Sequence, residues 1–367
     1  MSIPLHQPGG AAAHGATIKD VAGRADVSVA TVSRVLNEKG LVRQETVKRV
    51  LDAARELNYV PHGGARSLSM RRTSTVGVVL PDLHGEFFSE VIRGIDVASR
   101  RRGYHLLVSG SHSDWSEMVA VLIAVRGRVD GLIVMAPELE SGQVPSRLPA
   151  GIPVVLLNCR APGTWSIAID NTSGSRTMMQ HLFGLGHREV AFVAGPEGNS
   201  DAAERLRGWR DSMAAAGVGN LEGLRIEGDF SENAGYEAGY ALLSRGRRPT
   251  AVFAANDAMA IGALCALREQ GVKVPEEMAV VGFDDIPIAR FVSPPLSTVS
   301  VEIAELGRRA FELFLEATEP GRQPRLDTVP THLVIRESCG SRARAPDSER
   351  FEPTSHPQEP IEQEELR

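Results

Sequence analysis

Acidic and amide side chains stand directly after several short apolar runs of the chain, where they could bind hydroxyl groups. Asp82 follows the first such run, Asn158 a later one, Asn256 and Asp257 another, and Asp284 the last. Carboxylates and amides can each hydrogen-bond to neighbouring hydroxyls, so this set predicts a site for a small polyol. The alternative is local, because Asn and Asp after strands commonly cap the next helix. That alternative applies most to Asp257.

The apolar runs predict the sheets that would position these side chains. They begin at Thr75, Tyr104, Gly131, Pro153, Val190, Ala251 and Ala279. Mostly helix-length stretches lie between them, and such alternation indicates parallel sheets covered by helices on both faces. About 265 residues is generous for one sheet, so we expect two doubly wound lobes. Ligands of such sheets bind beyond the carboxyl ends of the strands, so the cleft between the lobes is the expected site.

Near the N-terminus, residues 17 to 37 hold two short helical patterns separated by a tight polar break. Thr17 is a suitable N-cap with Asp20 three residues later, and Ser28 can cap the second helix. This layout is typical of a helix-turn-helix DNA reader. The alternative is a pair of ordinary amphipathic helices within a larger domain. The expected apolar residues are Ile18, Val21 and Ala22 in the first helix and Val29, Val32, Val35 and Leu36 in the second.

A third helix is expected from about Gln44 to Leu57, so that three short helices can share one small core. Its apolar stripe would be Val47, Val50, Leu51, Ala54 and Leu57.

The charge of the chain is divided unevenly between its two parts. Residues 17–72 hold 11 Lys and Arg against 6 Asp and Glu, whereas the whole chain holds 40 against 46. A basic head therefore precedes an acidic body. Neutralising phosphates releases counterions, so this pattern favours binding of nucleic acid at the head alone.

These stretches resemble the LacI/GalR family of bacterial repressors. In the head the matching residues are TIKDVAGRADVSVATVSRVLN at Thr17 to Asn37, ELNYVP at Glu56 to Pro61 and ARSL at Ala65 to Leu68. In the body they are VDGLIV at Val129 to Val134, GHR at Gly186 to Arg188, the pair Asn256 and Asp257, GFDD at Gly282 to Asp285 and IRES at Ile335 to Ser338. The resemblance covers about residues 17–340.

The resemblance implies a small all-α helix-turn-helix headpiece followed by an α/β core of two doubly wound parallel-sheet lobes, like that of the periplasmic sugar-binding proteins. The chain would cross between lobes near Asp170, Ser300 and Pro330. We expect a disordered leader at 1–16, the helix-turn-helix domain at 17–61, a hinge helix or linker at 62–73, the effector-binding and dimerisation core at 74–340 and a disordered tail at 341–367. The N-lobe would hold about 74–170 and 300–329, and the C-lobe about 171–299 and 330–340.

In a headpiece of this family the second helix enters the major groove. Family positions make Val29 and Ala30 the sequence-reading pair, with Arg34 one turn further on. The two apolar side chains can favour a thymine methyl, and Arg34 is the candidate for a guanine, worth about 1–3 kcal/mol if bidentate. The alternative for Val29 is a buried core residue. Thr31, Ser33 and Lys19 would position phosphates, and the whole expected DNA-binding set is Thr17, Lys19, Ser28, Val29, Ala30, Thr31, Ser33, Arg34, Asn37, Arg66 and Leu68.

The segment from His62 to Thr73 is short and glycine-rich. Each Gly destabilises a helix by about 1 kcal/mol relative to Ala, so the segment should not form a stable helix by itself. In the family this segment becomes a hinge helix on DNA and wedges a leucine into the minor groove, which Leu68 would do here. Gly63 and Gly64 depart from the family's helix-favouring residues. The alternative is a flexible linker with an idle leucine.

Family positions add four side chains to the cleft. Phe87 and Phe88 would lie beside it, Arg205 would reach in from the helix after Pro196, and Phe230 would lie on the C-terminal lobe. Phe87 and Phe88 could equally be core residues. We expect a sugar or sugar derivative as the effector, with a nucleobase between Phe88 and Phe230 as the alternative. The complete expected effector-binding set is Asp82, Phe87, Phe88, Asn158, Arg205, Phe230, Asn256, Asp257 and Asp284.

The composition of the chain indicates which partners and which cellular compartment to expect. The chain has no run of 18 apolar residues, and its first 16 residues carry no Lys or Arg, so neither a membrane span nor a signal peptide is indicated. Three cysteines without CxxC spacing predict no metal site or disulfide framework, and we expect no cofactor. The expected partners are double-stranded operator DNA, a sugar-like effector and a second copy of the chain, in the cytoplasm near the nucleoid.

An enzyme and an exported solute-binding protein are the other classes considered. None of the lysines follows a glycine, so the chain has no Walker A loop, and it contains neither a G-x-S-x-G nor an H-E-x-x-H motif. A solute-binding protein would need an export signal where the basic headpiece stands. The sequence therefore favours a dimeric DNA-binding regulator over both.

Overall fold

The computed structural model describes residues 16–36, 42–59, 72–112, 114–138, 148, 151–245 and 248–341. The predicted leader up to residue 15, most of the expected hinge and the tail from residue 342 lie outside the described residues. Three helices come first, and their bounds are close to those that the spacing predicts: α1 (Ile18–Arg24), α2 (Val29–Leu36) and α3 (Gln44–Glu56).

The three helices pack around a small core. Its buried members are Val21, Ala22, Ala25, Val32, Val35, Val50, Ala53 and Ala54. Leu51, expected in the stripe of α3, is 39% exposed and lies outside this core. The apolar stripe is rotated relative to the prediction, because Ala53 rather than Leu51 lies on the side of α3 that faces the other two helices.

The next part of the chain forms a six-stranded parallel sheet in the order β11-β5-β4-β3-β1-β2. Its strands are β1 (Thr75–Leu80), β2 (His105–Gly110), β3 (Gly131–Met135), β4 (Val154–Leu157), β5 (Trp165–Ile169) and β11 (Leu326–Val329). The helices α5 (Glu86–Arg100), α6 (Trp115–Ala124) and α11 (Ile303–Ala317) belong to this N-terminal lobe, and α5 packs against α11.

A second six-stranded sheet has the order β12-β10-β9-β8-β6-β7. Its strands are β6 (Val190–Val193), β7 (Arg225–Ile226), β8 (Ala251–Ala254), β9 (Ala279–Asp284), β10 (Ser297–Ser300) and β12 (His332–Val334). Around it lie α7 (Asn171–Gly184), α8 (Ser200–Ala215), α9 (Glu232–Ser244), α10 (Asp257–Glu269) and the 3-10 turns η2 (Glu222–Leu224) and η3 (Pro287–Arg290). The strand β12 runs antiparallel to β10, so this sheet is not wholly parallel.

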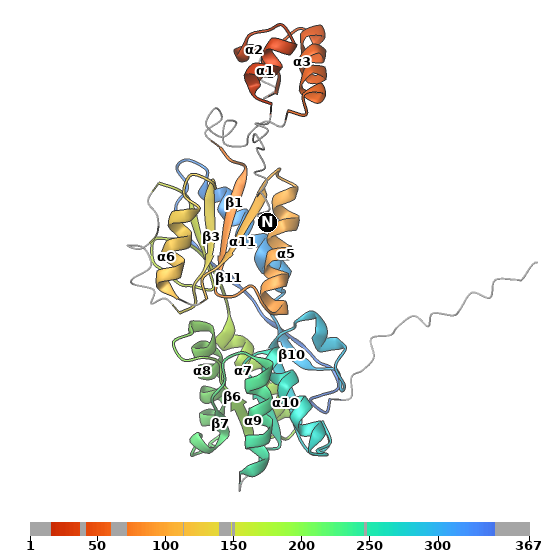
Figure 1. Ribbon diagram of the computed structural model, residues 1–367. Coiled ribbons are helices and arrows are strands. Elements are labelled where there is room, and N and C mark those ends of the chain that lie inside the picture. The colour runs from red at the N-terminus through yellow and green to blue at the C-terminus, as the bar shows by residue number, and fades with distance from the viewer. Residues whose placement is uncertain are drawn as a thin grey trace, which may run out of the picture.

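The chain passes between the two lobes three times (Figure 1). It leaves the first sheet after β5, returns to the N-terminal lobe between β10 and α11, and leaves again between β11 and β12. Parallel strands place their carboxyl ends at one edge of a sheet, so the loops that follow them can meet in the region between the lobes.

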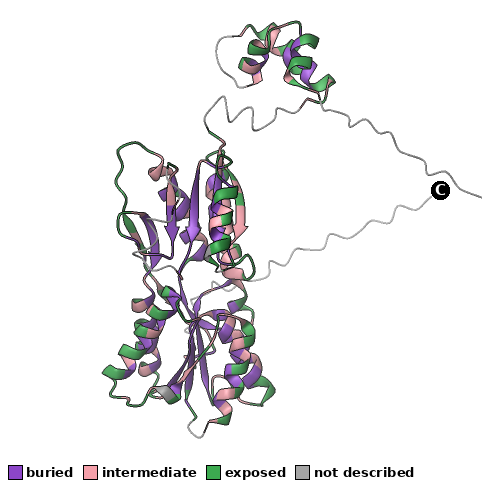
Figure 2. Cartoon of the chain, turned by 60° about the vertical axis from the view of Figure 1, so that its left-hand side comes forward, coloured by how far each residue is buried: buried purple, intermediate pink, exposed green. Residues whose placement is uncertain are grey.

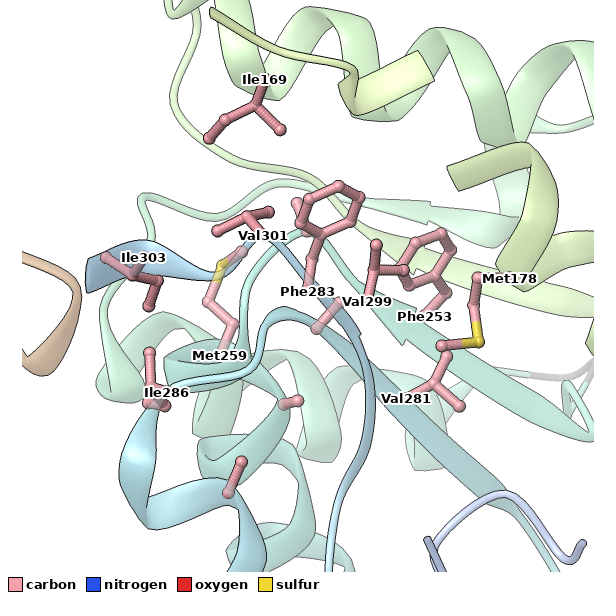
Figure 3. Packing of buried hydrophobic residues seen from close by; sticks show 14 of the residues in the cluster. Ile169, Met178, Phe253, Met259, Val281, Phe283, Ile286, Val299, Val301 and Ile303 are labelled. Atoms are coloured by element: carbon pink, nitrogen blue, oxygen red, sulfur yellow. The ribbon is translucent and has the colours of Figure 1, made fainter. Parts of the chain in front are cut away.

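All seven apolar runs identified in the sequence form strands, which confirms that part of the prediction. The strands β5, β7, β10, β11 and β12 were not predicted. The sheets are buried and the outer faces of the helices are exposed (Figure 2). In the C-terminal lobe Phe283 and Val281 on β9 lie with Phe253 on β8 and Val299 on β10 in one apolar cluster (Figure 3).

None of the helices in the described ranges combines the length and the apolar character that a membrane crossing requires.

Candidate DNA-reading helix and interlobe cleft

The helix α2 presents its first residues to solvent. Val29 is 41% exposed and Ala30 and Arg34 are exposed, whereas Val32 and Val35 are buried in the headpiece. Val29 is therefore not a core residue, which removes the alternative considered for it. The exposed side of α2 can thus offer a methyl-bearing surface followed one turn later by a guanidinium.

Several of the predicted DNA-contact residues also hold the headpiece together. The backbone N–H and Oγ1 of Thr17 both donate to Asp20 Oδ2 at 2.7 Å, which completes a capping box and lowers the pKa of Asp20. The backbone N–H of Thr31 donates to Ser28 Oγ at 3.1 Å, so Ser28 caps α2. Lys19 is exposed and Ser33 is half-buried. Asn37, Arg66 and Leu68 lie outside the described residues.

A cavity of about 570 Å³ lies between the two lobes. Eight of the nine predicted effector-binding residues line it: Asp82, Phe87, Phe88, Asn158, Arg205, Phe230, Asn256 and Asp284. The strand-end residues predicted from the sequence are thus brought together with the aromatic and arginine side chains. Asp257 is the exception.

Asp257 does not line the cavity, so its placement in the effector site was wrong. The residue is fully buried, where its Oδ2 accepts a hydrogen bond from the Ile286 backbone N–H at 2.9 Å and its Oδ1 one from Thr298 Oγ1 at 2.5 Å. Burial, reinforced by the charge of Asp284, raises the pKa of Asp257 well above its usual value. Asp257 is the first residue of α10 and its side chain bonds to β10, whereas Asn256 is the extended N-cap residue before the helix and borders the cavity.

Arg205 is buried at the floor of the cavity and is fully engaged with the protein. Its Nε donates to Asn171 Oδ1 at 2.9 Å, its Nη1 donates to the Ala255 carbonyl at 2.7 Å, and its Nη2 lies 2.8 Å from Asp284 Oδ1. The guanidinium also lies over the Phe283 ring, 3.9 Å from its centroid. Both partners of this ion pair are buried, so the guanidinium of Arg205 compensates the charge of Asp284 inside the protein.

Asp201 on α8 joins this polar floor and was not predicted from the sequence. Its Oδ1 accepts from Asn171 Nδ2 at 2.7 Å and its Oδ2 from Asn158 Nδ2 at 2.8 Å. Burial raises the pKa of Asp201 to about 6, against the opposing charge of Arg205. Burial likewise raises the pKa of Asp284 to about 6, again against Arg205.

Polar contacts join the lobes at both ends of the cavity. On one side Asn158 of the N-terminal lobe binds Asp201, and the Ser200 backbone N–H donates to the Pro137 carbonyl at 2.9 Å. On the other side the Ile288 backbone N–H donates to Glu86 Oε2 at 2.9 Å. The cavity is therefore bounded by both lobes in this conformation, and a ligand inside it can contact both.

Asn256 and Phe230 support each other at the C-terminal side of the cavity. Asn256 Oδ1 accepts from the Met259 backbone N–H at 2.9 Å, so it caps α10 as the local alternative predicted, and its Nδ2 donates to the Phe230 carbonyl at 2.9 Å. Phe230 has φ +73°, and its ring lies 5.8 Å from the Arg205 guanidinium. Positive φ costs a non-glycine residue free energy, so this contact from Asn256 helps to hold the ring in place.

The aromatic residues by which the N-terminal lobe lines the cavity stand in the first turn of α5. Phe87 and Phe88 both line the cavity, with ring centroids 5.6 Å apart and an edge-to-face orientation. Both also pack against the main apolar core. Asp82 is exposed at the rim, where its Oδ1 accepts from the backbone N–H groups of Leu83 and His84.

The comparisons with known proteins agree with this architecture. Residues 17–62 match the family described as bacterial regulatory proteins, lacI family, and residues 179–339 match a periplasmic binding protein-like domain. The HTH-type transcriptional repressor PurR of Edwardsiella ictaluri is 36% identical over 330 residues, which are 88% of this chain and 96% of that protein. The chain belongs to the LacI family of bacterial regulatory proteins.

Other members of the LacI family show the same relationship along the chain. The ribose operon repressor of Escherichia coli K12 is 37% identical over 323 residues, which are 86% of this chain and 97% of that protein. The Lac repressor dimer bound to operator and the anti-inducer ONPF superposes with a TM-score of 0.81 at 29% identity, covering 89% of this chain and 99% of that one. This LacI-family protein is a DNA-binding transcriptional regulator.

Several residues that line the cavity of this LacI-family regulator were missed by sequence reasoning. Besides Asp201 they include Glu86, Glu138, Asn199, Asp229, Ser231 and Glu232. Four of them, Glu86, Asn199, Ser231 and Glu232, lie at or next to the first residue of a helix. The sequence did contain a signal for these four residues. Each is an acid or a capping residue at the start of the helix that follows a strand, and such helices begin where the parallel strands end.

Proposed function

We propose that this regulator binds a palindromic operator as a homodimer, and that a sugar or sugar derivative in the interlobe cleft controls its affinity for that DNA. The observation that carries the effector part is the cavity floor. There a buried arginine and two buried carboxylates line the cavity together with Phe230, and the buried Asn158 Oδ1 has no hydrogen-bond partner in the described part of the chain. Hydroxyl groups can donate to such oxygens, while an aromatic face covers the apolar side of a sugar ring.

The dimer is supported by the symmetry of DNA recognition. A palindromic site offers two equivalent half-sites, and two copies of one headpiece can read it. The Lac repressor that superposes on this chain is described as a dimer bound to operator. In the headpiece, Val29, Ala30 and Arg34 would read bases, and Leu68 would enter the minor groove at the centre of the site.

Control would operate through the contacts between lobes. A ligand that contacts both lobes changes the free-energy difference between their arrangements only if it binds one arrangement better. The coupling between effector and operator is reciprocal and is typically about 1–3 kcal/mol. We further propose that the protein acts in the cytoplasm and is not an enzyme, since its relatives are transcriptional repressors.

The test combines selection of DNA with a ligand screen. Full-length protein is used to select binding sites from random duplexes, and the selected site is then titrated by fluorescence anisotropy with and without ligand. We expect a palindromic sequence, and a sugar that changes the operator Kd by at least fivefold. A selected site without two-fold symmetry contradicts the dimeric reading.

Substitutions then connect the cleft to the response. We expect Asp284→Asn to reduce the response to that sugar, while Asp211→Asn, an exposed acid on α8, leaves it unchanged. A response that survives Asp284→Asn intact means that the effector binds elsewhere. A nucleobase such as hypoxanthine that acts while every sugar is silent assigns the cleft to the nucleobase alternative.

A further inference from the structure

Acidic side chains outnumber basic ones in the lining of the cavity. One arginine, Arg205, lines it together with an exposed histidine, His84, whereas seven carboxylates line it: Asp82, Glu86, Glu138, Asp201, Asp229, Glu232 and Asp284. Asp201 and Asp284 are buried, Glu86 and Glu138 are half-buried, and the other three are exposed at the rim. Negative charges that line one cavity repel each other, and burial weakens the screening of that repulsion by water and salt.

The single arginine is not available to balance an anionic ligand. Its Nε, Nη1 and Nη2 are directed to Asn171, the Ala255 carbonyl and Asp284. A phosphate or carboxylate that bound Arg205 would have to displace one of these partners. If the ligand displaced Asp284, the buried carboxylate of Asp284 would lose the positive charge that compensates it.

Helix N-termini are the other usual source of anion binding, and here they already carry acids. The first turns of α5, α8, α9 and α10 hold Glu86, Asp201, Glu232 and Asp257 respectively. A carboxylate in the first turn satisfies the positive end of the helix dipole. The cavity therefore lacks the free N-terminal positive charge that phosphate sites commonly use.

One buried oxygen atom shows what the cavity does offer. Asn158 Oδ1 is buried and has no hydrogen-bond partner in the described part of the chain. Asn158 lines the cavity, and its amide oxygen can only accept hydrogen bonds. Its partner must be a donor, and hydroxyl groups of a sugar or polyol are donors that bring no negative charge. Asn158 and Asp284 have φ +53° and +112°, so backbone strain is retained at both positions.

From these observations we propose that the cleft selects an uncharged sugar or polyol and rejects the phosphorylated or carboxylated forms of the same sugar. This inference rests on the proposed function, because it concerns the effector of the same cleft. The proposed function alone would equally admit a sugar derivative with a phosphate group.

Matched pairs of ligands test the selection directly. Full-length protein is screened by thermal shift and then by calorimetry against D-ribose and ribose 5-phosphate, glucose, glucose 6-phosphate and gluconate, cellobiose, glucitol and hypoxanthine. We expect at least one neutral sugar or polyol to bind, and its phosphate ester or acid to bind at least tenfold more weakly. The difference should shrink as salt is raised, because the carboxylates at the rim are screened.

The outcomes separate this inference from the proposed function. A phosphate ester or an aldonate that binds as tightly as its neutral parent, or that binds alone, overturns the charge selection but leaves a sugar-responsive regulator. Binding of hypoxanthine with no response to any sugar overturns both. Silence of all the neutral sugars and polyols also counts against the inference.

A substitution at the rim provides the second test. The double change Asp229→Asn with Glu232→Gln removes two exposed charges that line the cavity without touching its buried floor. We expect the ratio between the Kd of the ester and that of the neutral sugar to fall at least threefold. The matched control is Glu237→Gln, an exposed acid on α9 outside the cavity lining, which should leave the ratio unchanged. An unaltered ratio in the double variant contradicts the inference.

Discussion

Thr73 donates two hydrogen bonds to a single oxygen of Asp130, one from its backbone N–H at 2.5 Å and one from Oγ1 at 2.8 Å. The Ser74 backbone N–H adds a third, to the other oxygen of the carboxylate at 3.0 Å. Thr73 lies just before β1 and Asp130 just before β3. One carboxylate thus fixes the chain at the point where it enters the core from the segment that follows the headpiece.

We predict that Asp130→Ala weakens operator binding by about five- to tenfold and reduces the effect of the effector on it. The reason is that without these bonds the chain at Thr73 is no longer fixed to the first sheet of the core. Hydrogen bonds to a charged group contribute at most about 1.5–3 kcal/mol each, and these three are only partly buried. Anisotropy titrations with and without effector measure the change. The control is Asp96→Ala, a surface acid on α5 that pairs with Arg100, and equal losses in both variants would argue against a special role for Asp130.

Arg205 is predicted to be a determinant of stability as well as of binding. Arg205→Ala leaves Asp284 and Asp201 without their compensating charge, and breaking a buried pair in this way costs about 3–5 kcal/mol. Urea unfolding measures the loss, and Arg210→Ala, an exposed arginine on the same helix, should change stability by no more than about 0.5 kcal/mol. If the alanine variant does not fold, Arg205→Lys retains the charge but not the three directed contacts and should still lose stability. A fully stable Arg205→Ala protein contradicts the account of the cavity floor.

The raised pKa values of Asp201 and Asp284 predict a pH dependence of stability. Their pKa is about 6 in the folded protein, against an ordinary value of 3.8. Between these values the folded protein holds protons that the unfolded chain has released, so the free energy of unfolding should fall as pH rises from about 4 to about 6. Above about 6 this contribution levels off.

Asp201→Asn removes one of the two groups and should make that slope shallower, by a total of about 3 kcal/mol across the interval. Urea titrations at several pH values between 4 and 7 provide the slopes. Asp211→Asn, the exposed control on α8, should keep the slope of the unaltered protein. Parallel curves for the protein and Asp201→Asn would show that Asp201 does not titrate as proposed.

Arg34 is predicted to supply much of the base discrimination, because Val29 and Ala30 have no hydrogen-bonding side chains. Arg34→Ala should weaken binding to the selected operator by about 1–3 kcal/mol and relax the preference at one base pair in each half-site. Lys48→Ala, an exposed cation on α3, should instead weaken all sequences alike or have no effect. Selection of DNA sites with each variant distinguishes these results, and an unchanged preference in Arg34→Ala assigns readout to other residues.

The sequence predicted the strands with continuous apolar runs but not those whose burial depends on distant partners. β10 reads Ser297, Thr298, Val299, Ser300 and is fully buried. Its polar groups are satisfied by residues far along the chain: the Ser297 backbone N–H donates to Ser338 Oγ, and Thr298 Oγ1 donates to Asp257. No local pattern contains those partners, so the segment does not look like a strand in the sequence.

The same distinction applies to the cleft. The rule that polar residues at strand ends meet in an α/β protein brought Asp82, Asn158, Asn256 and Asp284 to one cavity. It could not separate Asn256 from its neighbour Asp257, since that depends on where the extended backbone ends and α10 begins. It also omitted Asp201, because this carboxylate belongs to the first turn of α8 rather than to a strand end, and its partners Asn158 and Asn171 are distant in the sequence.

The buried carboxylate of Asp257 has a consequence for genetics. It holds the Ile286 backbone N–H and the Thr298 hydroxyl, and Asp284, two residues before Ile286, lies on the cavity floor. A mutant screen for regulators that no longer respond to their inducing or co-repressing signal should therefore recover Asp257 alongside Arg205 and Asp284. The resulting phenotype would be indistinguishable from loss of a ligand contact, although the side chain at 257 does not border the cavity.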